Sequence, residues 1–236
     1  IRAAGSEVRY VAVDVADRER VRAALAEVRT AWGPITGVVH GAGLLADRWI
    51  ADKTDEQFNR VFAAKVEGLR ALVEATAGDP LKLFAVFSSV AARTGNAGQC
   101  DYAMANEVLN KVTAALRRGR GVVARAIGWG PWDGGMVSPS LAAKFEQAGV
   151  GILGLAEGAR RFVEELRAPL DEIEVVIGGA AGEGPLGGAG GPAMNVELNV
   201  DERSHRQLAD HRLAGRPVVP LAVVVDWLAR AARSYR

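Results

Sequence analysis

Four polar residues have the types and spacing to share one catalytic centre: Lys65, Ser89, Tyr102 and Asn106. Tyr102 and Asn106 are four residues apart, which places them on one face of a predicted helix. Lys65 falls within the apolar stripe of another predicted helix. A buried ammonium costs several kcal/mol unless it is paired or its pKa falls. The alternative is that the Lys65 stem lies on the core while its amine reaches water.

A phenol beside an ammonium is suited to proton transfer. The usual tyrosine pKa of about 10 is too high for efficient exchange at neutral pH, and a nearby positive charge favours the phenolate. A decrease of about 3 units corresponds to roughly 4 kcal/mol of electrostatic stabilisation. We therefore expect a poorly solvated Lys65 to lower the pKa of Tyr102.

Strands and helices alternate along the chain, which predicts an α/β fold with a doubly wound parallel sheet covered on both faces. The carboxyl edge of such a sheet brings Ser89 close to the turn at Gly41, Ala42 and Gly43. The expected strands are 8–15, 35–40, 81–89, 122–127 and 173–177. The expected helices are 19–32, 54–76, 102–118 and 157–166, the second beginning with a capping box of Thr54 and Gln57.

Composition narrows the class of protein. The 236 residues carry 29 Lys plus Arg against 28 Asp plus Glu, so there is no excess charge to attract nucleic acid. The single cysteine, Cys100, excludes an internal disulfide framework. No apolar run approaches the roughly 18 residues of a membrane span, and charged residues occur throughout the first 30 positions, so we expect no signal peptide. We expect a cytoplasmic protein that binds neither nucleic acid nor membrane.

The pattern changes after residue 178. Residues 179–194 are rich in glycine and predict a linker, and residues 195–236 form a second, shorter segment. A unit of that size does not easily bury a core by itself. The chain begins without Met and close to a strand pattern, so we expect it to be a piece of a longer polypeptide.

Ser89 followed by Tyr102 thirteen positions later resembles the short-chain dehydrogenase/reductase family. Most members carry Tyr-x-x-x-Lys, whereas Asn106 stands at that lysine position and Lys65 lies on the preceding helix. The same exchange is typical of ketoreductase domains of modular polyketide synthases and related fatty acid synthases, including polyunsaturated fatty acid synthases. Further similar stretches are VVHGAG (38–43), FSSVA (87–91), GQCDY (98–102) and GWGPWDGGMV (128–137).

The resemblance implies a Rossmann-like fold over residues 1–178 and reduction of a β-ketoacyl thioester by NADPH. Tyr102 would donate the proton, Ser89 would orient the carbonyl, and Asn106 would help to order a proton-relay water. Lys65 would depress the pKa of Tyr102. The cofactor-binding residues implied by the family are Asp14 and Val15 at the adenine, Gly41, Ala42 and Gly43 along the backbone, and Gly130, Pro131 and Trp132 at the nicotinamide.

Family members bind the cofactor pyrophosphate on a first strand and a Gly-rich turn. No G-x-G-x-x-G precedes residue 8, so we expect the reductase to lack this part and the chain alone to bind cofactor poorly. The partners implied are an acyl carrier protein bearing the β-ketoacyl thioester and neighbouring synthase domains.

The tail carries a second motif, H-x-x-x-G-x-x-x-x-P, at His211, Gly215 and Pro220. It resembles the beginning of the dehydratase domains of the same synthases, which implies a partial hot-dog α+β segment at 195–236 with His211 as general base. A surface histidine and an inactive remnant are the alternatives.

Two other functions stay open at this point. One is a reductase-like subdomain without catalysis that braces its neighbours, although such subdomains usually lose the tyrosine and the lysine. The other is a free-standing reductase of small alcohols, which the exchange of Lys65 and Asn106 disfavours.

Overall fold

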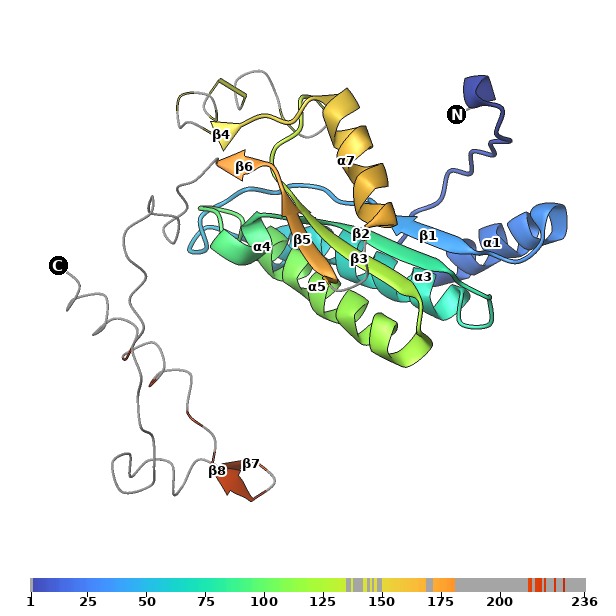
Figure 1. Cartoon of the computed structure of the whole chain (residues 1–236). Coiled ribbons are helices and arrows are strands. Elements are labelled where there is room, and N and C mark those ends of the chain that lie inside the picture. Colours follow the sequence, from blue (N-terminus) through green and yellow to red (C-terminus); the bar gives the residue numbers. More distant parts are fainter. Residues whose placement is uncertain are drawn as a thin grey trace. The chain divides into compact units, whose positions relative to one another are not determined.

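The computed structural model of the chain divides it into two units, Ile1–Gly188 and Ala189–Arg236 (Figure 1). The residues that it describes are 2–134, 137, 142–143, 145, 147, 150–168, 172–180, 212–213, 215–217, 219, 223 and 227.

A parallel sheet of four strands in the order β1-β2-β3-β5 forms the centre of the first unit. Its strands are β1 (Gly37–His40), β2 (Leu83–Ser89), β3 (Val123–Trp129) and β5 (Glu174–Ile177). The register aligns the ends of β2 and β3, with Ser89 beside Trp129. The prediction of a parallel α/β sheet is confirmed, and four of the five expected strands form it.

Helices cover both faces of this sheet. Figure 1 shows α7 (Leu155–Arg167) on one face, and α3 (Gly68–Ala75) and α5 (Cys100–Arg120) on the other. The other helical elements are η1 (Arg2–Ala4), α1 (Arg18–Trp32), α2 (Asp55–Phe62), the π-helical turn η2 (Ala63–Glu67) and α4 (Ala91–Thr94). The predicted capping box of Thr54 and Gln57 begins α2. The helix expected over 54–76 is therefore confirmed, with a π-helical turn inside it.

Alternate residues of β2 and β3 face opposite layers. Phe84, Val86 and Ala124 are buried in one cluster with Leu109 of α5. Phe87 has the opposite parity, and its ring lies 5.3 Å from that of Phe162 on α7. This alternation explains why the strands read as continuous apolar runs: both faces of the sheet are covered.

The expected strand at residues 8–15 is wrong. The segment has no regular secondary structure, and Tyr10 is 88% exposed. A β-branched run becomes a strand only when a neighbour completes its hydrogen-bond ladder. No described strand pairs with this segment, because the sheet runs from β1 to β5 without it.

Two short antiparallel pairs were not predicted. In the first unit, β4 (Val150–Gly151) pairs with β6 (Gly179–Ala180). In the second unit, β7 (Arg212–Leu213) pairs with β8 (Arg216–Pro217) around Gly215, whose φ of 77° suits glycine. Gly215 belongs to the tail motif; His211 and most of the expected linker and hot-dog segment lie outside the described residues.

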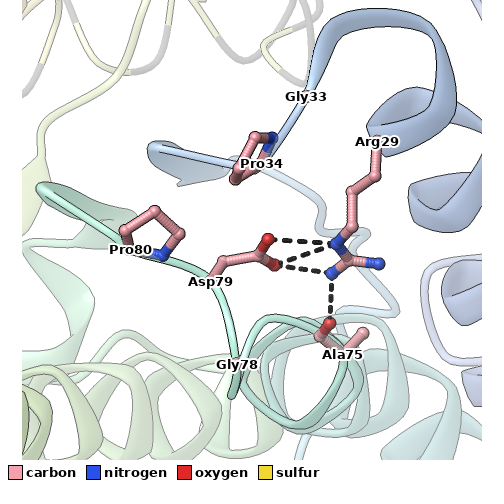
Figure 2. A pocket seen from close by; sticks show the side chains of 7 residues that line it. All are labelled: Arg29, Gly33, Pro34, Ala75, Gly78, Asp79 and Pro80. Atoms are coloured by element: carbon pink, nitrogen blue, oxygen red, sulfur yellow. Dashed lines mark hydrogen bonds and ion pairs between the residues drawn. The ribbon is translucent and has the colours of Figure 1, made fainter.

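An ion pair joins α1 to the amino end of the sheet. Figure 2 shows the Arg29 guanidinium directed at the Asp79 carboxylate, with a further hydrogen bond to the Ala75 main-chain oxygen. Asp79 also accepts a hydrogen bond from the Ile35 amide at 3.1 Å, just before β1. The hydrogen bond from Arg29 and the one from the Ile35 amide hold the pKa of this carboxyl below its usual value, although burial of the side chain alone would raise it.

We expect Asp79→Asn to lower the free energy of unfolding by about 1–3 kcal/mol at pH 7, because it leaves Arg29 without its carboxylate. Since the folded-state pKa of Asp79 is depressed, the stabilisation is present above the unfolded-state pKa and is lost as pH falls through the folded value. Urea denaturation at pH 7 and pH 3 measures this, and the difference in stability between the two chains should be smaller at pH 3 than at pH 7.

Glu157→Gln is the matched control. Its carboxylate is also paired with arginines, but it lies exposed on α7 and should contribute little. An equal loss of stability in both variants at pH 7 would contradict the role given to the Arg29–Asp79 pair.

Candidate functional site

A cavity of about 890 Å³ opens at the carboxyl ends of the parallel strands. Of the predicted site residues, Gly41, Gly43, Lys65, Ser89, Tyr102, Gly130, Pro131 and Trp132 line it. The structure thus brings together eight candidates from well-separated parts of the chain. Cavities of this size accommodate small-molecule ligands and cofactors.

Lys65 lies in the middle of the π-helical turn η2. The turn is fixed from the sheet, because the Nε2–H of His40, at the end of β1, donates a hydrogen bond to the Lys65 main-chain oxygen at 2.8 Å. Burial lowers the pKa of His40 and so favours the neutral imidazole, in the tautomer that carries its proton on Nε2. π-helical turns are frequent at functional sites, and this one sets the direction of the Lys65 side chain.

The Lys65 amine does not reach bulk water. The residue is 3% exposed, and its Nζ donates a hydrogen bond to the Phe87 main-chain oxygen at 3.0 Å. Burial lowers the pKa of Lys65 from 10.5 to about 8. The alternative of an amine that extends to solvent is therefore wrong, and Lys65 is a desolvated cation inside the cavity wall.

Lys65 and Tyr102 are neighbours, as their chemistry requires. The Lys65 Nζ lies 5.3 Å from the centroid of the Tyr102 ring, a cation–π distance. The pKa of Tyr102 is nevertheless raised above 10, because burial disfavours the phenolate more than hydrogen bonding with Ser89 and Asn106 favours it. The expected decrease is thus wrong for this structure: desolvation outweighs the favourable contacts.

The two remaining polar residues are held by backbone contacts. The Ser89 Oγ accepts a hydrogen bond from the Ala91 amide at 3.1 Å, at the beginning of α4, so its hydroxyl proton can be donated to the Tyr102 oxygen or to a ligand. Asn106 is fully buried, and its Nδ2 donates to the Tyr102 main-chain oxygen at 2.8 Å. Its Oδ1 has no hydrogen-bond partner among the described residues.

The turn after β1 lines the cavity with Gly41 and Gly43, which have no side chains to fill it. A Cβ atom on Gly43 would lie 3.0 Å from Lys65 Cε and 3.2 Å from its Nζ. A side chain there would therefore press on the amine and fill the space beside it. Elsewhere in the lining, main-chain hydrogen bonds of 2.8 Å hold Gly130 to Ile177 and Pro131 to Leu153.

Several predicted site residues are not in the cavity wall. Asp14, Val15 and Ala42 do not line it, and Asn106 reaches it only through Tyr102. The Asp14 carboxylate caps a local turn by accepting from the Ala16 amide at 3.0 Å. His211 lies outside the described residues.

Sequence reasoning identified Trp132 but missed Phe87 and Trp129, the other aromatic residues that line the cavity beside it. The Trp129 and Trp132 rings lie 4.8 Å apart, and Phe87 lies 5.4 Å from Trp129. Trp132 also packs on α7, where a Cβ on Gly158 would lie 2.2 Å from its ring. The ends of β2 and β3 were recognisable, but which aromatic residues face the cavity depends on the parity of each strand and on the position of α7.

Other kinds of site have no support in the described part of the chain. It contains no cluster of three or more His, Cys, Asp or Glu side chains that is able to hold a metal ion. None of its helices combines the length and hydropathy that a bilayer crossing requires.

Comparison with protein families identifies a match to the KR domain over residues 1–134. Among curated proteins, one component of the polyunsaturated fatty acid synthase of a Thraustochytrium species is 35% identical over 230 residues. This alignment covers 97% of the chain and 8% of the relative. Erythronolide synthase EryA2 of Saccharopolyspora erythraea is 38% identical over 164 residues, which are 69% of the chain and 4% of that protein. The chain therefore spans only a small part of these relatives.

Comparison with solved structures also identifies ketoreductases. An A-type ketoreductase from a modular polyketide synthase superimposes with a TM-score of 0.69 and 33% identity. The superposition covers 76% of the chain and 38% of that structure. The cavity that contains Lys65 and Tyr102 is thus built on a fold shared with ketoreductases.

We expect Lys65→Met to raise the free energy of unfolding by about 1–3 kcal/mol at pH 7, because it removes a buried charge. The folded-state pKa near 8 lies below the unfolded value, so the native chain gains stability as pH rises from about 8 to about 10.5. The advantage of the variant should therefore be complete below pH 8 and shrink toward pH 10, as measured by urea denaturation. Lys111→Met, at an exposed site on α5, should change little, and a loss of stability in Lys65→Met at pH 7 would contradict this assignment.

Proposed function

The chain belongs to the KR domain family, and from this membership we propose that its first unit reduces a β-ketoacyl thioester to the β-hydroxyacyl thioester. The observation that carries the proposal is the placement of Lys65, Ser89 and Tyr102 around one cavity at the carboxyl edge of the sheet. A phenol, a hydroxyl and a desolvated ammonium form a suitable set for protonating a carbonyl oxygen.

In the proposed mechanism, the substrate carbonyl oxygen lies between Ser89 and Tyr102. The Ser89 hydroxyl donates a hydrogen bond to it, since the Oγ is already fixed as an acceptor of the Ala91 amide. Tyr102 transfers its phenolic proton to the same oxygen. Its raised pKa keeps the proton on the phenol until negative charge develops on the carbonyl oxygen.

Lys65 acts on the phenolate that remains. Its Nζ faces the Tyr102 ring and has no carboxylate partner among the described residues, so its positive charge opposes the accumulation of negative charge on Tyr102. Asn106 completes the group: its unpartnered Oδ1 is an available acceptor for a water that would return a proton.

The cavity also fits the nicotinamide end of NADPH, which supplies the hydride for the β-carbon when it is bound. Gly43 leaves the turn after β1 without a Cβ beside Lys65, which permits close approach of a planar ring and its ribose. Gly130, Pro131 and Trp132 would border the ring from the opposite wall. We assign the adenine contacts to Asp14 and Val15 on the family resemblance.

We further propose an acyl carrier protein and neighbouring synthase domains as partners. The relatives are much longer synthases, and this supports an arrangement in which the substrate arrives on a carrier. The boundaries proposed are a ketoreductase at 1–178, a linker at 179–194 and the beginning of a dehydratase at 195–236. The tail motif with His211 and Gly215, and a match to a polyunsaturated fatty acid synthase over nearly the whole chain, support this order.

The test of the reductase is Tyr102→Phe. The variant keeps the ring and removes the proton, so NADPH oxidation with a β-ketoacyl thioester should fall by about a hundredfold to ten-thousandfold. Tyr10→Phe, on a ring that is 88% exposed, is the matched control and should retain full activity.

Two outcomes would overturn the proposal. Activity retained in Tyr102→Phe would exclude this residue as the acid. A folded native chain that binds NADPH and the substrate but does not oxidise NADPH would favour the non-catalytic structural role.

A further inference from the structure

A buried ion pair lies next to the catalytic candidates. The Lys53 Nζ is 2.7 Å from the Asp101 Oδ2, and the two side chains are 3% and 2% exposed. Withdrawing two charges from water is costly, and the attraction between them often only offsets that cost. A pair of this kind is therefore weak evidence for a purely stabilising role, and its position in the fold becomes the informative property.

The pair connects two segments of the site. Asp101 belongs to the first turn of α5, and its Oδ1 accepts the Tyr102 amide at 2.9 Å. Lys53 ends the segment between β1 and α2, and its Nζ also donates to the Ala46 main-chain oxygen at 2.8 Å. One ammonium thus holds both this segment and the helix terminus that carries Tyr102.

Two other hydrogen bonds join the same segments. The Gln99 Nε2 donates to the Asp47 Oδ2 at 2.9 Å, and the Arg48 amide donates to the Gly98 main-chain oxygen at 3.0 Å. Gly98, Gln99 and Asp101, which precede Tyr102, are therefore each bonded to the segment between β1 and α2. Of these three contacts, only the Lys53–Asp101 contact pairs two opposite full charges.

We propose that Lys53 and Asp101 are positioning residues for Tyr102. Their pair fixes the first turn of α5 and neutralises the carboxylate that accepts the Tyr102 main-chain amide. Neither residue touches the reacting atoms in this assignment. The inference rests on the proposed function for its catalytic meaning, but its physical content is tested without cofactor or substrate.

The charges around Tyr102 predict opposite shifts of its pKa when Lys53 or the charge of Asp101 is removed. Lys65 faces the ring from η2, Asp47 acts from the segment after β1 and raises the pKa of Tyr102, and Asp101 lies on the same helix. Removing Lys53 alone adds an unpaired negative charge, which disfavours the phenolate. Removing the charge of Asp101 alone adds an unpaired positive charge, which favours it.

The experiment is a fluorine NMR titration of the full chain labelled with 3-fluorotyrosine, whose more acidic phenol titrates where the chain stays folded. The chain has three tyrosines, and Tyr102→Phe identifies the signal of Tyr102. We expect Lys53→Met to raise the pKa of Tyr102 measurably and Asp101→Asn to lower it. The double variant should return it close to the native value.

Lys111→Met is the matched control, because it breaks an exposed pair with Glu107 on the same helix and should leave the pKa of Tyr102 unchanged. Lys53→Arg keeps the charge and should preserve the native titration. Shifts of the same sign in both single variants, or no shift in either, would overturn the proposal, since loosening of the fold has no reason to reverse sign.

Folding of the variants is followed by circular dichroism. If only one of the two single variants folds, a shift of the Tyr102 pKa in the expected direction supports the proposal. A shift in the opposite direction, or no shift, overturns it. If neither folds while the double variant folds and titrates as the native chain, the pair serves stability alone and the proposal fails. Because the titration needs no turnover, an inactive native chain would overturn the proposed reductase without affecting this result.

Discussion

The burial of the Lys65 ammonium is the constraint on which the site depends. Burying such a charge costs several kcal/mol, so the contacts that hold the amine must offset this cost. The π-helical turn directs the side chain inward, His40 fixes that turn through the Lys65 main-chain oxygen, and Phe87 accepts from the amine. The glycine at position 43 is part of the same arrangement, because any side chain there would press on the amine.

The same desolvation moves two pKa values in opposite directions. It lowers the pKa of Lys65 to about 8 and raises that of Tyr102 above 10, since burial favours the neutral form of each. The resting site therefore holds its proton on the phenol and a readily lost proton on the amine. Negative charge that develops on a carbonyl oxygen would draw the tyrosine proton to that oxygen, and the charged lysine would stabilise the phenolate left behind, so the two groups act as a coupled pair.

Much of this was accessible from the sequence, for identifiable reasons. Apolar runs that alternate with capped helices predicted the four strands of the sheet, and the positions of Ser89 and Tyr102 in this pattern placed them at its carboxyl edge. The strand expected at 8–15 failed because a ladder partner is not a property of the segment itself. The Lys53–Asp101 pair could not be found, since its members are 48 positions apart and each is ordinary in its own segment. The pKa of Tyr102 depends on how completely the site excludes water, which spacing does not report.

The two ends of the sheet use ion pairs differently. At the amino end, Arg29 is partly exposed and pairs with Asp79 to hold a helix against two loops. At the carboxyl end, the side chains of Lys53 and Lys65 are almost fully buried, and of these two only Lys53 has a carboxylate partner among the described residues. Lys65 is left with a carbonyl oxygen and an aromatic ring, contacts that solvate a cation without neutralising it. Its uncompensated positive charge therefore remains available to negative charge that arises during a reaction, whereas the pairing of Lys53 confines its charge to a positioning role.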